Sequence, residues 1–353
     1  MTVLKLGSLF DGIGVFPLAA MHCGMEPVWA SEIEARPISI TKRHFPDMLH
    51  LGDITKISGA EIPPVDVITF GSPCQDLSQI GTRNGFAGKK SSLFYQAMRI
   101  IEEMRYATNG RYPAFTVWEN VAGAFSSNDR LDFAAMLRAF TGAEVSVPPR
   151  GWAHAGMVRG GCADTAWRLL DAQYWGEPAL VQRRKRVFVV ADFAGQRAGE
   201  VLFKPRTVLP FSSIGGPGGL SATQRGGVPA AQTGRQVPIV RTFSLRRMRT
   251  MAQVGDQKGF CASFGRGGEP FPTLLASVTA PFSFWYEGEE RDGFLRVLTP
   301  LECERLMGLP ENWTKYGCKN EEISDHARYR ALGNSIALPC AEYVMAGIAE
   351  VMN

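Results

Sequence analysis

Three short clusters of polar residues in this chain have side chains that together could carry out chemistry. Pro73-Cys74-Gln75 provides a thiol, Glu119-Asn120-Val121 provides a carboxyl group, and Gln182-Arg183-Arg184-Lys185-Arg186 provides guanidinium groups. A thiolate is a soft nucleophile, and nearby positive charge lowers the pKa that controls its formation. Such a set is suited to nucleophilic attack on the ring of a pyrimidine base.

Each cluster lies at the end or the start of a strand pattern. We expect strands at residues 3–9, 27–32, 66–71, 114–119, 165–171 and 186–191, with amphipathic helices at 15–23, 35–45, 91–106 and 131–141. This alternation favours a doubly wound α/β sheet. Ligands of such sheets bind at the carboxyl ends of the strands. Cys74 and Glu119 are therefore expected at one edge of the sheet.

Each cluster also has a purely structural interpretation. Cysteine is among the most often buried residues, and an isolated one is usually an inert core thiol. The polar surroundings of Cys74, from Ser72 to Asp76, favour a reactive thiol instead. Glu119 could simply pair with an arginine, and the basic run could be the solvated start of a strand.

A glycine-rich turn follows the first predicted strand, at Phe10-Asp11-Gly12-Ile13-Gly14. Such a turn lets a ligand approach the backbone closely. Glu32 ends the second predicted strand and Asp53 follows Leu51-Gly52. Carboxylates at these places can accept hydrogen bonds from ribose hydroxyls and from an adenine amino group. The third glycine of the dinucleotide pattern is missing, which weighs against a bound pyrophosphate. A nucleoside without phosphates, such as S-adenosylmethionine, fits better.

Charge is unevenly distributed along the 353 residues. The total is only +4, but residues 181–250 contain 13 lysines and arginines against two acidic residues, and the rest of the chain is net acidic. A basic segment of this kind indicates a contact with a polyanion, although a solvated positive face is an equally simple interpretation. Residues 211–236 include seven glycines and cannot continue a core. They fall within a second module.

The composition excludes several classes of protein. Hydrophobic residues make up 45% and charged residues 20%, and no apolar run is long enough to cross a bilayer. The first residues run directly into a strand pattern without a secretory signal, so we expect a cytoplasmic protein with no membrane contact. The seven cysteines are dispersed and contain no C-x-x-C pair, which predicts neither a disulfide framework nor a metal site.

The motifs and their order resemble those of the cytosine-C5 DNA methyltransferase family, in its bacterial or phage type. The resemblance runs from the turn at residues 10–14 through Pro-Cys-Gln, Glu-Asn-Val and Gln-Arg-Arg-x-Arg, resumes at residues 296–310 and ends at Gly333-Asn334-Ser335. The sequence departs from the family at Val15, where many members have glycine, and at Val181, where proline is common. Neither departure affects a residue with an expected catalytic role.

The resemblance implies a DNA (cytosine-5-)-methyltransferase and a role for each site residue. Cys74 would add to C6 of a flipped-out cytosine, Glu119 would be protonated and bond N3, and Arg186 would contact O2 with Arg184 nearby. The expected cofactor is S-adenosyl-L-methionine. Its pocket would be lined by Phe10, Gly12, Gly14, Glu32, Ile33, Asp53, Ile54, Gly71, Pro73, Leu93, Asn334 and Ser335.

The predicted architecture is a Rossmann-like, S-adenosylmethionine-dependent methyltransferase domain with a smaller, irregular target-recognition domain. The catalytic domain is expected at residues 1–193 plus 326–353, closed by a helix at residues 337–352, and the target-recognition domain at 194–325. The expected partner of a monomer is double-stranded DNA, and a restriction enzyme acting separately is left open. Transfer RNA as substrate, an inactive DNA-binding homologue and a thiol-redox enzyme remain as alternatives. Arg241, Arg246, Arg247 and Arg249 would contact guanines or phosphates.

Overall fold

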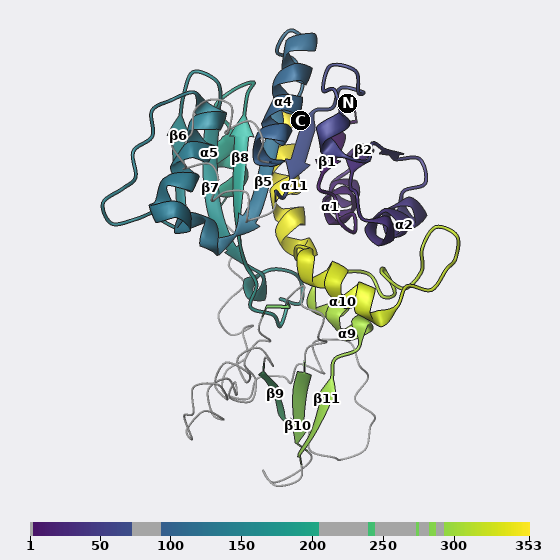
Figure 1. Ribbon diagram of the computed structural model, residues 1–353. Helices are drawn as coiled ribbons and strands as arrows, with labels where there is room; N and C mark the ends of the chain where they lie inside the picture. Colours follow the sequence, from purple (N-terminus) through teal and green to yellow (C-terminus); the bar gives the residue numbers. More distant parts are fainter. Residues whose placement is uncertain (1–2, 73–92, 205–238, 244–272, 275–281, 287–292) are drawn as a thin grey trace.

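An eight-stranded mixed sheet with helices on both faces forms the centre of the protein (Figure 1). The structure is a computed structural model and describes residues 3–72, 93–204, 239–243, 273–274, 282–286 and 293–353. The strand order is β3-β2-β1-β4-β5-β8-β7-β6. The strands are β1 (Lys5–Leu9), β2 (Glu26–Ser31), β3 (Leu49–His50), β4 (Val67–Phe70), β5 (Phe115–Val121), β6 (Ala155–Arg159), β7 (Asp164–Asp171) and β8 (Lys185–Asp192). The predicted α/β fold is confirmed.

The sheet changes direction at β5. The strands β3, β2, β1, β4 and β5 are parallel, whereas β8, β7 and β6 are each antiparallel to their neighbour. The strands from β1 to β5 that form the parallel part follow the order expected of a doubly wound sheet. The antiparallel part brings the start of β8, with its arginines, to the end of β5.

Two hydrophobic cores cover the two faces of the sheet. One contains residues of α1 (Val15–His22), α2 (Ala35–His44), α6 (Ala198–Leu202) and α11 (Leu338–Met352). The other contains residues of α4 (Leu93–Ala107) and α5 (Leu131–Thr141). Adjacent residues of a strand serve opposite cores, as Val117 and Trp118 of β5 do, because side chains alternate across a sheet.

The end of the chain packs against its beginning. Helix α11 lies against α1 and α6 (Figure 1), and the predicted C-terminal helix is confirmed to within a residue. Before it come α9 (Pro300–Leu306) and α10 (Asp325–Asn334). Helix α9 begins with a capping box, in which Thr299 and Glu302 satisfy each other's backbone N–H groups.

The body formed around the eight-stranded sheet includes residues outside the predicted catalytic domain. Helix α6 contacts β7 and α11, and Leu298, Leu306 and Trp313 are buried in the same core as α1. The division at residues 193 and 326 stays a prediction. Among the described residues, however, 194–204 and 298–325 are continuous with the catalytic body.

A separate three-stranded antiparallel sheet lies below the large body in Figure 1. It consists of β9 (Ile239–Phe243), β10 (Phe282–Tyr286) and β11 (Gly293–Val297), in the order β11-β10-β9. This sheet falls within the predicted target-recognition domain. The loop at residues 211–236, together with Arg246, Arg247 and Arg249, lies outside the described residues.

Short 3₁₀ helices follow several strands: η1 (Ile54–Lys56), η3 (Ala122–Phe125), η4 (Ser127–Arg130) and η5 (Ala172–Tyr174). In the described part of the chain, no single helix is long and apolar enough to cross a membrane. Helices α10 and α11 reach that length and apolarity only as a pair, and they are bent by 43° at the break between them.

Candidate active site

Glu119 and Arg186 form an ion pair at the end of β5. The antiparallel register places Arg186 opposite Val121, so its long side chain reaches diagonally to Glu119. Arg186 Nε lies 2.9 Å from Glu119 Oε1, and the two side chains are only 14% and 12% exposed. Burial raises the pKa of Glu119, while Arg186 and then Arg184 oppose the rise. The site therefore contains a carboxyl group with a stronger preference for its neutral form than an exposed glutamate has.

Arg184 is buried and bonds main-chain carbonyls from distant parts of the chain. Its Nη1 donates to the carbonyl of Leu274 at 2.8 Å, and its Nη2 donates to the carbonyls of Gly333, at 2.9 Å, and Ser335. Burial, with the charge of Arg186 beside it, lowers its pKa to about 9, which leaves it charged at neutral pH. Through these contacts Arg184 joins the start of β8 to the C-terminal loop and to the segment at residues 273–274, as a positioning residue would.

The backbone that leads to Cys74 is held by β5. Pro73 and Cys74 themselves lie outside the described residues. Two residues before the cysteine, the hydroxyl of Ser72 accepts a bond from Trp118 Nε1 at 3.0 Å, and its carbonyl accepts one from Asn120 Nδ2 at 3.0 Å. The strand that supplies Glu119 thus also fixes the entrance to the segment that contains the thiol.

Gly71 lies directly beside the carboxyl group of Glu119. A Cβ atom at position 71 would come 3.1 Å from Glu119 Oε2, closer than most side chains tolerate. A glycine at the end of β4 therefore leaves the carboxyl group its space. Gly71 and Glu119, both predicted site residues, are brought together by neighbouring parallel strands.

The turn between β1 and α1 has an unusual backbone. Phe10, Gly12 and Gly14 all have positive φ angles, of 55°, 59° and 77°. Glycine adopts this region freely, whereas for Phe10 it is strained, and such strain gathers at functional sites. A Cβ atom at Gly12 would meet nothing within 4 Å, so there is open space beside the turn.

Glu32 follows β2 and is bonded to this turn. Its Oε2 accepts the N–H of Gly12 at 2.9 Å, and its Oε1 accepts the N–H groups of Ile33 at 2.7 Å and Glu34 at 2.9 Å. A carboxylate has about four acceptor sites, so one remains for a ligand hydroxyl. Ile33 beside it is 73% exposed, and thus offers an apolar surface to solvent.

Asp53 and Ile54 follow β3. Asp53 Oδ1 accepts the N–H and the hydroxyl of Thr55 at 2.9 and 2.8 Å, and these bonds lower the pKa of Asp53. Its carboxylate therefore stays charged and is fixed in direction. The side chain of Ile54 is buried in the core, so only its backbone could face a ligand.

The C-terminal loop returns to the same edge of the sheet. Arg330 Nη2 lies 2.7 Å from Glu34 Oε1, and Trp313 Nε1 donates to the carbonyl of Ile13 at 2.8 Å. These contacts bring Asn334, which is exposed, and Ser335 toward the turns that contain Glu32 and Gly12. Leu93, at the start of α4, is half-buried and packs against the core that Phe10 and Ile54 also contact.

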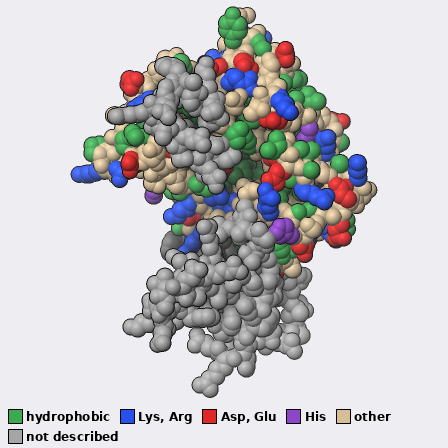
Figure 2. Space-filling view, viewed as in Figure 1, with side chains coloured by type: hydrophobic (Ala, Val, Ile, Leu, Met, Phe, Trp, Pro, Cys, Tyr) green, Lys and Arg blue, Asp and Glu red, His purple; other side chains and the backbone are tan. Residues whose placement is uncertain are grey.

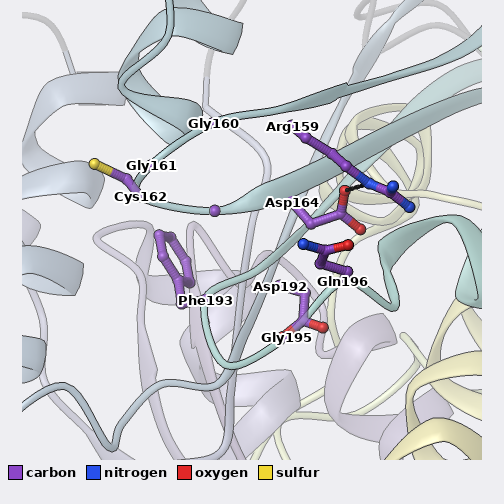
Figure 3. A pocket seen from close by; sticks show the side chains of 10 residues that line it. Arg159, Gly160, Gly161, Cys162, Asp164, Asp192, Phe193, Gly195 and Gln196 are labelled. Atoms are coloured by element: carbon purple, nitrogen blue, oxygen red, sulfur yellow. Dashed lines mark hydrogen bonds and ion pairs between the residues drawn. The ribbon is translucent and has the colours of Figure 1, made fainter.

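A polar cavity of about 150 Å³ lies elsewhere, between the β6–β7 turn and the end of β8 (Figure 3). Asp192 is opposite Phe115, the first residue of β5, so this cavity is at the other edge of the sheet from Glu119. Its carboxylates are paired, Asp164 with Arg159 at 3.1 Å and Asp192 with Arg197 at 2.9 Å. Among the described residues, no cluster of three or more potential metal ligands occurs. The cavity is thus separate from the candidate site.

Several residues of the site were not predicted from the sequence. Asp11, Ser72, Trp118 and Arg330 all contact or adjoin predicted residues, yet none has a pattern of its own. No role for Asn120 was predicted from the sequence, although its place in the Glu-Asn-Val motif is a signal that it belongs to the site. Figure 2 shows that lysine and arginine side chains are among those exposed on this face of the large body.

Comparisons with known proteins identify the family of the chain. The family model described as C-5 cytosine-specific DNA methylase matches residues 4–204 and 236–350. The chain therefore belongs to that family, and the predicted enzyme class, a DNA cytosine-C5 methyltransferase, is confirmed.

The individual relatives are distant. The Type II methyltransferase M1.ScrFI of Lactococcus lactis subsp. cremoris is 27% identical, over 99% of this chain and 78% of its own length. A protein of Escherichia phage P1 named DNA N-6-adenine-methyltransferase is 24% identical over 98% of this chain, which spans 61% of that relative's length. The crystal structure of a putative DNA modification methyltransferase encoded within an Escherichia coli prophage superposes with a TM-score of 0.61, at 18% identity over 99% of each chain. That likeness shows the fold.

Proposed function

We propose that this protein methylates C5 of a cytosine in a specific sequence of double-stranded DNA, through a transient bond between the Cys74 sulfur and C6 of the base. The observation that carries the proposal is the buried ion pair of Glu119 and Arg186, 2.9 Å apart. Asn120, the residue after Glu119, is bonded to the carbonyl of Ser72, which stands two residues before Cys74 in the sequence. A raised carboxyl pKa next to a fixed guanidinium is what protonation and orientation of a pyrimidine require.

Three residues of the chain would activate the target base for methyl transfer. The Cys74 thiolate adds to C6, and the ring electrons move toward C5 while protonated Glu119 bonds N3 and Arg186 bonds O2. C5 thereby becomes the nucleophile. After the methyl group is transferred, loss of the C5 proton to a base restores the double bond and expels the thiolate.

Residues at the same edge fit S-adenosylmethionine as the methyl donor. Glu32 has an acceptor site for a ribose hydroxyl, Ile33 offers an apolar surface for an adenine ring, and Asp53 can accept from its amino group. The open space at Gly12 admits a ligand close to the backbone. When bound, the cofactor would supply a methyl group on a sulfonium.

The target base has to leave the helix for this chemistry, because C6 is shielded inside a duplex. Extrusion costs a few kcal/mol, which contacts in the pocket offset. We propose that the basic segment at residues 181–250 and the sheet formed by β9, β10 and β11 bind the opened duplex. We further propose a monomer that acts in the cytoplasm, whether or not a separate restriction enzyme recognises the same sequence.

Analysis of the modified nucleosides tests the proposal. Unmethylated DNA incubated with the protein and methyl-labelled cofactor should yield 5-methylcytosine, as measured by mass spectrometry after digestion. The Cys74→Ser variant should bind cofactor but transfer no methyl group. N6-methyladenine, as the name of the phage P1 relative would suggest, or methylation of transfer RNA alone, would contradict the proposal. Bisulfite sequencing of DNA from expressing cells would then give the target sequence.

A further inference from the structure

Three consecutive residues of η4, in the loop after β5, have a left-handed backbone. Asn128, Asp129 and Arg130 have φ angles of 46°, 52° and 72°. Asparagine and aspartate tolerate this region, whereas for arginine it is unfavourable. The buried carboxylate of Asp132 holds the loop, because it accepts bonds from the hydroxyl of Ser127 and from Asn128 Nδ2. Strain that the surrounding bonds maintain in this way gathers at binding sites.

The strained loop places the guanidinium of Arg130 against a second loop, which leads to β6. A Cβ atom at Gly151 would come 3.2 Å from Arg130 Cζ, so the guanidinium lies directly against the glycine backbone. The indole N–H of Trp152 donates to the carbonyl of Arg130 at 3.0 Å. The Trp152 ring in turn packs against buried Phe133, with 5.0 Å between the ring centroids. Both loops are thus anchored in the body, and the guanidinium has a defined position at its surface.

Arg130 and the nearby Arg150 are exposed cations without a charge partner. Among the described residues, no ion pair or hydrogen bond engages either guanidinium, whereas Arg138 of the following helix pairs with Glu144. Asp129, which is also exposed, is the acidic residue next to Arg130. A guanidinium has five N–H donors in one plane, a geometry that matches the oxygen atoms of a phosphate. A fixed guanidinium that no carboxylate occupies is therefore suited to bind a phosphate.

The two loops lie at the same edge of the sheet as the candidate active site. Ala155, the first residue of β6, is opposite Arg168 of β7. Arg168 is in turn opposite Phe188 of β8, which is opposite Glu119. Three strand spacings of about 4.8 Å separate β6 from β5, a span of roughly 15 Å. Successive phosphates of one DNA strand advance about 3.4 Å along the helix axis. A duplex that runs along this edge, with its target base at Glu119, would bring a phosphate about four nucleotides away to these loops.

We propose that Arg130 binds a backbone phosphate of the substrate duplex to one side of the target base, and that Arg150 contributes to the same contact. The inference rests on the proposed function, and it extends the DNA contact from the basic segment at residues 181–250 to the catalytic body. A phosphate carries no sequence information, so the contact would fix the position of the duplex without helping to recognise its sequence. Arg130 would bind substrate and take no part in the chemical step.

Combined changes in the protein and in the DNA test the contact. A set of duplexes contains the target sequence, and in each one a single phosphate within about six nucleotides of the target cytosine is replaced by an uncharged methylphosphonate. Fluorescence anisotropy with the full-length protein gives the dissociation constants. At one position the replacement should weaken wild-type binding by about 5- to 20-fold, the loss of a charged hydrogen bond, and should have no effect in Arg130→Gln, where that bond is already absent.

The salt dependence of binding provides a second measurement. Loss of one phosphate contact should make the slope of log affinity against log salt concentration shallower by about 0.9 in Arg130→Gln. Arg130→Lys keeps the charge and should retain most of the slope. Arg150→Gln should weaken binding by a smaller factor than Arg130→Gln. Circular dichroism confirms that the variants are folded.

Arg111→Gln is the matched control. Arg111 is also an exposed arginine, but it precedes β5 and so lies at the opposite edge of the sheet. Its replacement should leave the affinity and the slope unchanged. Wild-type affinity and slope in Arg130→Gln, or a methylphosphonate effect that is the same in Arg130→Gln as in wild type at every position, would overturn the phosphate contact and leave the proposed function intact. If the wild-type protein bound no duplex at all, both proposals would fall.

Discussion

Arg186 Nε and Glu119 Oε1 lie 2.9 Å apart between antiparallel strands, so the charge of Arg186 influences the protonation of Glu119. Burial favours the neutral carboxyl group, and the guanidinium favours the charged one. The balance between these two effects sets the pKa of Glu119, and with it the fraction of the carboxyl group that is protonated and can donate a hydrogen bond to a ligand.

Replacement of Glu119 by glutamine should abolish most of the methyl transfer. Glutamine keeps the shape of the side chain but cannot deliver a proton to N3, and general acid catalysis is typically worth 10²- to 10⁴-fold. We expect kcat to fall by about that factor, with cofactor affinity unchanged. Single-turnover methylation of a short duplex measures this loss. A variant that retained full kcat would remove Glu119 from the mechanism.

Replacement of Arg186 by alanine should shift the pH dependence of the remaining activity. Without the guanidinium, burial is less opposed and the pKa of Glu119 rises further. Since the mechanism needs protonated Glu119, activity is lost as pH rises through that pKa. The alkaline limb of the rate profile should therefore move to higher pH, although the rate itself falls. A limb that stayed in place, or moved to lower pH, would show that Glu119 is not the titrating group.

Asn120→Ala should slow methyl transfer more than it affects cofactor binding. The bond from Asn120 Nδ2 fixes the carbonyl of Ser72, two residues before Cys74, and its loss would let that segment shift. We expect a fall in kcat of about tenfold or more. Trp118→Phe is the companion variant, since it removes the bond to the Ser72 hydroxyl while keeping an aromatic ring in the core. Unchanged kcat in both variants would contradict a role for β5 in positioning the thiol.

Arg184→Met should destabilise the fold and not only the reaction. It leaves the carbonyls of Leu274, Gly333 and Ser335 without their donor, at about 1–3 kcal/mol for each that stays buried. Arg184→Lys should recover part of the loss. Urea unfolding measures both variants. Stability equal to wild type in Arg184→Met would show that the arginine serves catalysis alone.

Asp11→Asn should stabilise the unliganded protein in a pH-dependent way. The pKa of Asp11 is about 7 when folded, against an ordinary value of 3.8. Between these values the folded state holds more protons than the unfolded one, so stability falls as pH rises from about 4 to about 7. Asparagine removes this loss, and the gain at pH 8 has an upper limit of about 4 kcal/mol. Thermal unfolding at pH 4 and pH 8 tests it; a gain equal at both would contradict the titration.

Much of the sheet could be predicted from sequence because its strands are continuous apolar runs bounded by turns. Val67–Phe70 and the centre of β8 are of this kind. β6 was missed since Ala155–Arg159 alternates between exposed and half-buried residues with little apolar content, and α6 is too short for a helical period to show. The reversed direction of β8 also has no sequence signal, because a buried strand reads alike in either direction.

The candidate site was predictable only where residues stand in ordered motifs. Glu119 and Arg186 belong to such motifs, and the sheet register brings them together. The contacts of buried Arg184 with three carbonyls, and the burial of the Asp11 carboxyl oxygens, are properties of packing between distant segments. No local sequence pattern predicts these properties. The sequence therefore predicted a catalytic role for Arg184 and no role for Asp11.

The central claim is that the Cys74 sulfur bonds to C6 of the target base, and a mechanism-based trap tests it most directly. A duplex with 5-fluorocytosine at a proven target position cannot lose a C5 proton, so the adduct should persist. Mass spectrometry of the digested complex should find the methylated base attached to the peptide that contains Cys74, and none in Cys74→Ser. Turnover of the natural duplex without any adduct on the fluorinated one would contradict the account.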